Sequence, residues 1–149
     1  MNNTCWIFDI DGTLANLEHR LHHIQSKPKN WAAFNAGILE DEVIPQTLQL
    51  LRTMYTMGKH IVLCSGRNED SRVLTEQWLD VNAVPYHALY MRKSKDFRKD
   101  NIVKSELLDQ MLADGWTPQA VVDDRMSVCK MWHDRGIYVF CVNQGFNEF

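Results

Sequence analysis

Two carboxylates stand one residue apart near the start of this chain, at the end of an apolar run. The stretch "IFDIDGTL" covers Ile7 to Leu14 and contains Asp9 and Asp11. In an extended segment, residues two apart project to the same side, so both carboxylates would face one place. Two close carboxylates raise each other's pKa unless a cation neutralises them. The pair therefore either belongs to a solvated turn, where Asp-Gly is common, or forms part of a cation site.

Three further groups of polar residues could act together with that pair. Ser65-Gly66-Arg67 follows the run "HIVLC", Asp123-Asp124-Arg125 follows "AVV", and Lys104 lies between them in "NIVK". A cluster of carboxylates suits a hard cation that binds oxygen, and Mg²⁺ with several retained waters fits best. The Ser65 hydroxyl and the backbone amides after it could hold anionic oxygens, and Lys104 would add a compact positive charge. These residue types together indicate a phosphoryl-transfer site.

The elements that must position these residues alternate along the chain. Residues 5–8, 61–64 and 120–122 are short apolar runs without alternation, as expected of strands buried on both faces of a parallel sheet. "YHALYM" and "YVFCVN" are two further strand candidates. Apolar residues at helical spacing occupy the stretches between, and three of these stripes end near a glycine. The alternation predicts an α/β fold: a three-layer, Rossmann-like parallel sheet with right-handed crossovers.

This topology predicts where the polar residues meet. In open α/β sheets, ligands bind outside the carboxyl ends of the strands. Asp9, Ser65 and Asp123 all fall at the ends of strand candidates, so three distant segments should converge at one edge. Residues 15–42 are longer than a plain strand-to-helix connection, and we expect them to form a small cap insertion. With 149 residues, of which 45% are hydrophobic, the chain fits one domain over residues 1–149.

Composition and charge narrow the class of protein further. A formal net charge of −3 gives no global attraction to nucleic acid or anionic lipid, so a polyanion would need a local basic patch. Residues 92–104 contain six basic and two acidic side chains, which form either such a patch or ordinary solvated surface. The four cysteines show no close C-x-x-C pair, which favours buried thiols over disulfides or zinc. Because no signal peptide or membrane-length apolar run is visible, we expect a cytoplasmic protein without a membrane partner.

The motifs resemble those of a known superfamily. "DIDGTL" is similar to the first signature motif of the haloacid dehalogenase (HAD) phosphotransferases, and Ser65, Lys104 and Asp123-Asp124 match the second, third and fourth motifs in order. The finer pattern of "SGR", "RKD" and "DDR" resembles in particular the 3′-phosphatase domains of phage polynucleotide kinase–phosphatases. The chain has no G-x-x-x-x-G-K-[ST] loop, so we expect no kinase half in this sequence. The resemblance covers nearly the whole chain and implies a HAD-like fold.

The resemblance also implies roles for individual residues. Asp9 attacks the substrate phosphorus and forms an aspartyl-phosphate, and Asp11 protonates the leaving oxygen and then takes a proton from the hydrolytic water. Gly12 permits the tight turn out of the strand, which Thr13 helps to fix. The implied Mg²⁺ ligands are Asp9, the Asp11 carbonyl, and Asp123 or Asp124. The candidate phosphate and substrate contacts are Thr13, Ser65, Gly66, Arg67, Arg98, Lys104 and Arg125.

The activity implied is that of a Mg²⁺-dependent phosphomonoesterase acting on a phosphorylated nucleotide or nucleic-acid end, in particular a polynucleotide 3′-phosphate. A 5′-nucleotide or small-metabolite phosphatase would use the same chemistry. A non-enzymatic receiver module also combines clustered aspartates, a hydroxyl residue, a lysine and Mg²⁺, but it carries its acceptor aspartate in mid-sequence. The second acid of "DIDGT" promotes turnover and favours an enzyme.

Several assignments stay open from sequence alone. One aspartate of the 123–124 pair could cap the helix that follows instead of binding metal. Arg67 and Arg125 could be surface ion-pair partners. Lys95 and Lys99 are rivals of Lys104 for the phosphate.

Asp100, within "RKD", could orient Lys104 or Arg98. The insertion carries three histidines, His19, His22 and His23, of which the first and last have the spacing of a helical zinc pair. The intervening leucines instead suggest an amphipathic cap helix, from which a histidine or Arg20 could face the substrate. Trp31 and Phe34 could stack on a nucleobase, although packing within the cap is the favoured interpretation.

Overall fold

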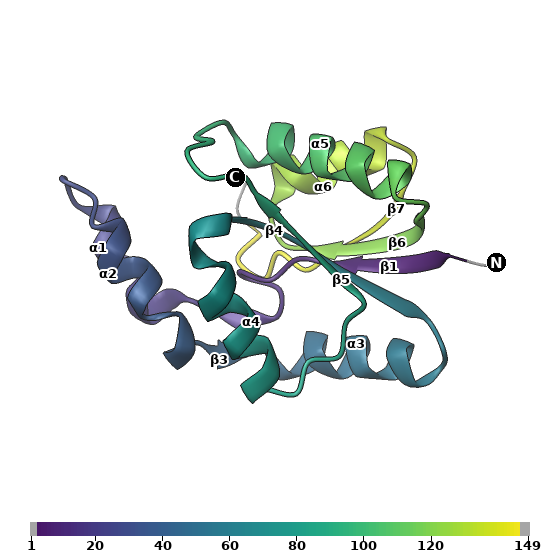
Figure 1. The fold of residues 1–149 in the computed structure, drawn as a ribbon, viewed down its shortest axis with the longest axis horizontal. Helices are drawn as coiled ribbons and strands as arrows, with labels where there is room; N and C mark the ends of the chain where they lie inside the picture. The colour runs from purple at the N-terminus through teal and green to yellow at the C-terminus, as the bar shows by residue number, and fades with distance from the viewer. Residues whose placement is uncertain (1–2, 147–149) are drawn as a thin grey trace.

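The computed structural model describes residues 3–146 and places a parallel five-stranded sheet at the centre of the protein (Figure 1). The strand order is β5-β4-β1-β6-β7, and every neighbouring pair is parallel. The bounds of the strands are Thr4–Phe8 for β1, His60–Asn68 for β4, Ala88–Arg92 for β5, Thr117–Asp123 for β6 and Tyr138–Cys141 for β7. The α/β fold class and all five strand candidates are therefore confirmed.

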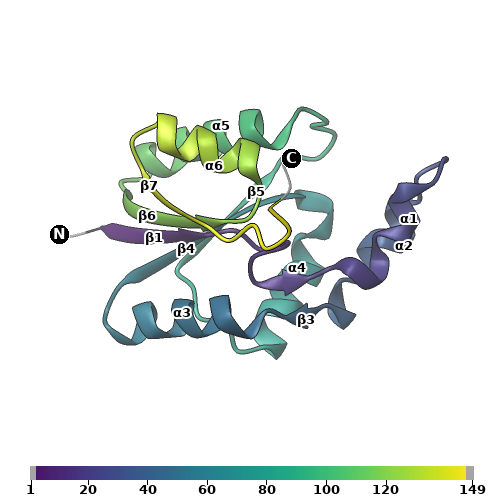
Figure 2. The same cartoon turned by 180° about the vertical axis from the view of Figure 1, so that it is seen from behind.

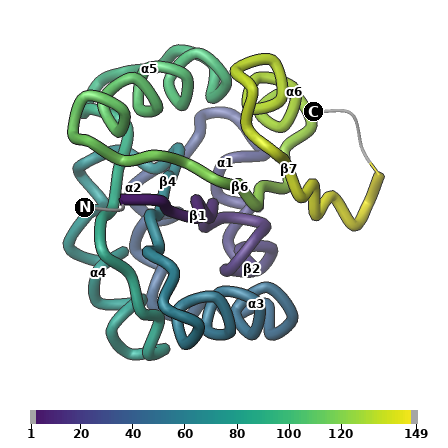
Figure 3. The backbone as a smooth tube through the Cα atoms, turned by 90° about the vertical axis from the view of Figure 1, so that its right-hand side faces the viewer, coloured from purple at the N-terminus to yellow at the C-terminus, as the bar shows by residue number. Residues whose placement is uncertain are grey.

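Helices cover both faces of the sheet. The bounds are Pro45–Thr56 for α3 and Arg72–Val81 for α4 on one face, and Asp100–Ala113 for α5 and Met126–Asp134 for α6 on the other. Seen along the strands, α5 and α6 lie on the side of the sheet opposite α3 and α4 (Figure 3). One apolar cluster lies on each face of the sheet, between the sheet and its helices. Alternate residues of β1 point to opposite faces, so Cys5 and Ile7 belong to one cluster and Phe8 to the other.

One strand end is less regular than the sequence predicts. The apolar run of β4 ends at Cys64, but the strand continues to Asn68, with an irregularity in its pairing with β5 between Ser65 and Asn68. Such irregularities re-aim side chains beside active sites. This one turns Arg67 toward the end of β1, where Asp11 lies.

The segment 15–42 consists of short elements that project beyond the carboxyl ends of the strands (Figures 1 and 2). Their bounds are Ala15–Asn16 for β2, Glu18–Arg20 for η1, His22–Gln25 for α1, Trp31–Ala36 for α2, Ile38–Glu40 for η2 and Glu42–Val43 for β3. β2 and β3 pair antiparallel and close the base of the segment. The segment thus lies outside the sheet and its flanking helices, and its role as a small cap stays a prediction.

The internal structure of this segment differs from the expected amphipathic helix. His19 lies in η1 and His23 in α1, so the two histidines do not share one helix and lose the spacing of a zinc pair. Phe34 is buried, as expected of cap packing, whereas Trp31 stacks edge-on against it and is half exposed. No helix in the described residues is long and apolar enough to cross a membrane.

Candidate active site

Three distant segments converge at the carboxyl ends of the strands. Asp9 directly follows β1, Asp123 ends β6, and Lys104 lies in the second turn of α5. The Lys104 ammonium contacts both carboxylates, with Nζ at 2.8 Å from Asp9 Oδ1 and 2.9 Å from Asp123 Oδ2. The other oxygen of Asp9 accepts a hydrogen bond from the Thr13 hydroxyl at 3.0 Å. All four side chains are buried, so Asp9 is held in one orientation by a lysine and a threonine.

A cluster of carboxylates surrounds the lysine. One oxygen each of Asp9, Asp123 and Asp124 lies within 4.8 Å of the other two. Burial raises the pKa of Asp9 well above its ordinary value, and the neighbouring Asp123 raises it further, while Lys104 opposes both. Burial likewise raises the pKa of Asp124. Three carboxylates facing one ammonium leave uncompensated negative charge, which is the arrangement expected of a cation site.

The two adjacent aspartates have different surroundings. Asp123 accepts hydrogen bonds from Lys104, from Trp132 Nε1 at 3.2 Å, and from the backbone amides of Asp124 and Arg125 at 2.8 and 3.3 Å. Its oxygens are therefore occupied by protein donors. The Asp124 carboxylate instead faces Asp9 and the Gly12 backbone, so closely that a Cβ on Gly12 would lie 2.0 Å from Asp124 Oδ2. Asp123 is the anchor of the turn into α6, and Asp124 borders the open side of the cluster.

Asp11 points away from this cluster and toward arginine. Arg67 forms a bidentate pair with it, with Nη2–Oδ1 at 2.6 Å and Nε–Oδ2 at 3.1 Å, and Arg20 Nη2 lies 3.4 Å from Oδ1. Burial raises the pKa of Asp11, but Arg67 and Arg20 together outweigh that effect and lower it below its ordinary value. The Asp11 side chain therefore stands apart from the three oxygens of the carboxylate cluster and is tied to guanidinium groups.

A second carboxylate, Asp41, supports both arginines. It accepts from Arg20 Nε and Nη2 at 2.8 Å each and from Arg67 Nη2 at 3.2 Å, while His19 Nε2 lies 2.6 Å from it. Arg20 also lies over the ring of Phe34, with its Cζ 4.2 Å from the ring centroid. Arg67 is thus not a surface ion-pair residue but a buried one. No motif in the sequence points to Asp41, and only the path of the insertion brings it to the site.

The turn after Ser65 is tightly enclosed. Ser65 is buried, and its Oγ accepts from the backbone amide of Arg67 at 3.1 Å. A Cβ on Gly66 would lie 2.7 Å from Asp100 Oδ1, so only glycine fits there without displacing that carboxylate. Asp100 itself pairs with Arg92 and with Arg125 Nη1, the latter at 2.8 Å. The expectation that Asp100 orients Lys104 or Arg98 is therefore wrong: its carboxylate is engaged by two arginines.

Other candidate residues lie outside this constellation. Arg98 forms ion pairs on the surface with Asp96 at 2.8 Å and with Glu106 at 2.7 Å. Lys95 and Lys99 are exposed, and neither side chain forms a hydrogen bond or ion pair with another described residue. Lys104 contacts the carboxylates of Asp9 and Asp123, because its place in the second turn of α5 directs its side chain into the site. In the described part of the chain, Lys95 and Lys99 make no such contact.

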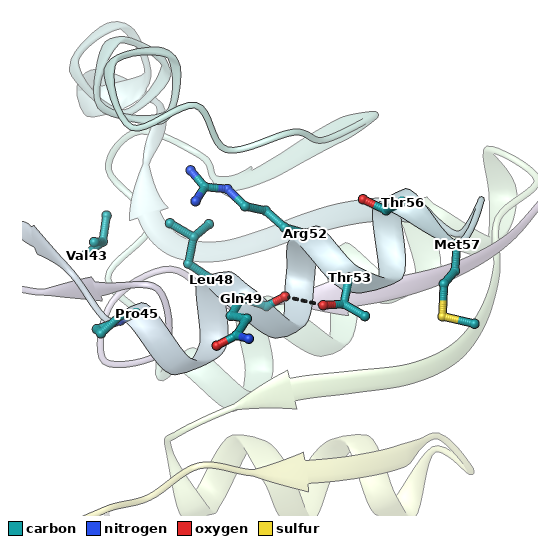
Figure 4. Close-up of a pocket in the computed structure, with 8 residues that line it drawn as sticks. All are labelled: Val43, Pro45, Leu48, Gln49, Arg52, Thr53, Thr56 and Met57. Atoms are coloured by element: carbon teal, nitrogen blue, oxygen red, sulfur yellow. Dashed lines mark hydrogen bonds between the residues drawn. The ribbon is translucent and has the colours of Figure 1, made fainter.

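A surface groove elsewhere carries no comparable chemistry. It runs along α3 and is lined mainly by that helix and by Val43 (Figure 4). Its one charged lining residue, Arg52, donates to the backbone carbonyl of Asn82 at 2.8 Å, and the Thr53 hydroxyl donates to the Gln49 carbonyl at 2.8 Å. The groove therefore plays no part in the site at the strand ends.

The fold is one that this chain shares with solved phosphatases and hydrolases of the haloacid dehalogenase (HAD) type. The class C acid phosphatase from Bacillus anthracis with tungstate bound matches with a TM-score of 0.67 at 14% identity, covering 97% of this chain and 71% of that one. A haloacid dehalogenase-like hydrolase, SP0104 from Streptococcus pneumoniae, matches with a TM-score of 0.70 at 14% identity, covering 99% and 87%. At such identities the likeness is one of fold.

The particular family follows from the sequence. Residues 3–147 match the family described as the polynucleotide kinase PNKP phosphatase domain, and the chain belongs to this family. It is 29% identical over 146 residues to a bifunctional polynucleotide kinase/RNA ligase assigned in Autographa californica nuclear polyhedrosis virus, covering 95% of this chain and 20% of the viral protein. A chain in the structure of the Pnkp1/Rnl/Hen1 complex matches with a TM-score of 0.79 at 29% identity, covering 95% and 46%. The chain thus spans less than half the length of these relatives.

Proposed function

We propose that this HAD-type phosphatase domain is a Mg²⁺-dependent phosphomonoesterase that acts through an aspartyl-phosphate on Asp9, and that its substrate is the 3′-phosphate of a nucleotide or polynucleotide. One observation carries the proposal. The Asp9 carboxylate is fixed between Lys104 and Thr13 beside two further aspartates, with a second acid, Asp11, two residues along the chain.

The residues present fit a magnesium ion. The cluster offers only oxygen ligands, from Asp9, Asp123 and Asp124, which suits a hard cation and not a thiolate-seeking one. Because Asp123 is already saturated with protein donors, Asp124 and Asp9 supply the freer oxygens, with the Asp11 carbonyl as a third. A bound Mg²⁺ would neutralise these carboxylates and polarise the phosphoryl oxygens.

In the proposed reaction, one Asp9 oxygen attacks the phosphorus, and the bond from phosphorus to the ester oxygen breaks. Lys104 and Ser65 hold the phosphoryl oxygens, which gain negative charge as the transfer proceeds. Asp11 gives its proton to the departing oxygen. A water then attacks the phosphorus of the aspartyl-phosphate, Asp11 takes the proton of that water, and inorganic phosphate leaves with Asp9 restored.

The pairing of Asp11 with Arg67 bears on this proton transfer. With Arg67 bound to it, Asp11 is ionised, which is the form that accepts the proton of water in the second half of the reaction. The first half requires the protonated form. A substrate phosphate dianion that pairs with the Arg67 guanidinium would compete with Asp11 for it. The weaker pairing would let the pKa of Asp11 rise.

The substrate class is supported by the shape of the insertion and by the relatives. The segment 15–42 is small and projects outward instead of closing over the strand ends, which suits a phosphate on the end of a longer molecule (Figure 1). The viral relative is named for polynucleotide kinase and RNA ligase activities, and the matched solved chains come from an RNA repair complex.

The proposal is tested by phosphate release from a 3′-phosphorylated oligonucleotide, a 3′-mononucleotide, a 5′-mononucleotide and a sugar phosphate, each with Mg²⁺ and with EDTA. We expect the 3′-phosphates to be preferred and EDTA to abolish release. Asp9→Asn should lower the rate by about 10³-fold or more, since the covalent route is lost, whereas the surface change Asp109→Asn should leave it unchanged. Equal activity of Asp9→Asn and wild type would exclude the aspartyl-phosphate. Turnover of the 5′-mononucleotide or sugar phosphate, but not of 3′-phosphates, would assign a metabolite phosphatase instead.

A further inference from the structure

The loop between β5 and α5 carries charge that the catalytic constellation does not use. Residues 93–99, here called the basic loop, contain four basic residues and one acidic residue. The side chain of Arg98 forms ion pairs with Asp96 and Glu106. The other three basic side chains, Lys93, Lys95 and Lys99, are exposed and form no hydrogen bond or ion pair with any residue in the described part of the chain. In a protein of net charge −3, this concentration of exposed positive charge is local.

An aromatic side chain stands among these lysines. Phe97 is 88% exposed, whereas most large apolar side chains of the sheet and its helices are buried. Such exposure contributes nothing to the core of this fold. A flat apolar ring flanked by positive charge is the combination that binds single-stranded nucleic acid, in which bases stack on aromatic rings and phosphates pair with lysines.

The basic loop is attached directly to the phosphate turn of the active site. The Arg92 guanidinium donates from Nε to the Gly66 carbonyl at 2.8 Å and from Nη1 to the carbonyls of Asp96 and Arg98 at 2.9 and 2.6 Å. One side chain thus joins the turn after Ser65 to the middle and the end of the loop. The loop extends from the same end of the sheet as α1 and α2 (Figures 1 and 2), so it borders the approach to Asp9.

Two of these lysines do not serve the stability of the loop. Lys99 occupies the N-cap position of α5, where no side chain caps the helix and where a positive charge is opposed by the helix dipole. Lys95 adopts a left-handed backbone conformation, with φ of 63°, which a lysine side chain does nothing to favour. Both residues stand at positions where asparagine, aspartate or glycine would be preferred structurally.

We propose that the basic loop binds the nucleic-acid strand behind the terminal phosphate, with Phe97 stacking on a base near the 3′ end and Lys93, Lys95 and Lys99 contacting the preceding backbone phosphates. This inference rests on the proposed function, since it assumes that the reacting phosphate lies at Asp9. It goes further in assigning the contacts that favour a polynucleotide over a mononucleotide.

The test compares kcat and KM for a 3′-phosphorylated ten-nucleotide strand and for a nucleoside 3′-monophosphate, using wild type, K93Q/K95Q/K99Q, Phe97→Ala and the control K59Q/K130Q. The control removes positive charge from lysines outside the loop. We expect both loop variants to raise KM for the strand by about 10-fold, with kcat on the strand and both constants on the mononucleotide unchanged. The slope of log(kcat/KM) against log salt for the strand is negative, and its magnitude should decrease by up to about 2 for the triple variant, at about 0.7 per lost contact.

The possible failures separate the two proposals. A wild-type protein that hydrolyses the mononucleotide but not the strand overturns the proposed substrate and this inference together. A wild type that hydrolyses both equally well, or loop variants that affect both substrates alike or match K59Q/K130Q, overturn the inference alone. Circular dichroism and thermal melting of the variants show whether a uniform loss of activity reflects misfolding, in which case the single variants Lys93→Gln and Lys95→Gln repeat the comparison.

Discussion

Replacing Asp41 by asparagine should destabilise the protein far more than an equivalent change on the surface. Asp41 has no exposed side-chain area, and its two arginine partners, Arg20 and Arg67, are 2% and 6% exposed. With Asp11, whose side chain is 27% exposed, these residues form a largely buried set of two positive and two negative groups. Asp41→Asn preserves the shape of the side chain and leaves the set with one excess positive charge.

The magnitude follows from the cost of an uncompensated buried charge. Removing one partner of a buried pair costs about 3–5 kcal/mol, and since asparagine still offers one acceptor oxygen, we expect about 3 kcal/mol. At a urea m-value of about 2 kcal/mol/M, this lowers the unfolding midpoint by about 1.5 M. Urea titration followed by tryptophan fluorescence measures the shift.

Two further variants make the test specific. Asp109→Asn breaks an ion pair of 2.6 Å with Arg135, but Asp109 is 64% exposed, so its cost should stay below about 1 kcal/mol. The double variant of Asp41→Asn with Arg20→Gln restores one negative charge against one positive charge, and it should cost less than the sum of the single changes by about 1–3 kcal/mol. Equal costs for Asp41→Asn and Asp109→Asn, or strict additivity in the double variant, would refute the charge-balance argument.

Two more predictions concern a turn and a titration. Gly12 and Gly58 both have positive φ, at +82° and +88°, but a Cβ on Gly12 would meet Asp124 whereas Gly58 faces open space. Gly58→Ala should lower the stability by about 1 kcal/mol and leave phosphatase activity intact. Gly12→Ala should abolish activity, because the new Cβ would displace the Asp124 carboxylate. Activity in Gly12→Ala would show that catalysis does not require Asp124 at this position. Burial, and then the neighbouring Asp114, raise the pKa of Tyr90 to about 12 from 10.0, so this tyrosine stabilises the fold below pH 10 and loses that contribution as the pH rises toward 12. Tyr90→Phe, which lacks the 2.6 Å hydrogen bond to Asp114, should be less stable by about 1 kcal/mol at pH 8 and show a smaller fall in Tm between pH 10 and 12; an unchanged fall would assign the alkaline sensitivity elsewhere.

The strands and helices follow closely from the sequence because their apolar residues recur at clear periods. Residues 5–8 and 120–122, which were expected to be buried on both faces, lie side by side in the sheet. The order of strands then brings Asp9 and Asp123 to one edge, since parallel strands share their carboxyl ends. The nine-residue β4 is longer than the sequence predicts, because its last residues, from Ser65 to Asn68, are polar or glycine and carry no strand pattern.

The segment 15–42 was predictable only in outline. Its helices have three to six residues, too few to establish a period, so the single helix expected around His19 and His23 is two short elements. This matters for the active site, because the segment carries Arg20 and Asp41. Arg20 lies beside Asp11, and Asp41 pairs with both Arg20 and Arg67.

The sequence by itself determined which carboxylates meet at the strand ends: residue order and apolar periodicity set the sheet, and the sheet fixes where Asp9 and Asp123 lie. The tertiary structure alone decided how charge is shared among them. Asp11 faces Arg67 and not the carboxylate cluster, and Asp123, not Asp124, is saturated with donors. The physical reason is that pairing between side chains depends on distances of a few ångströms across the fold, which spacing along the chain does not encode.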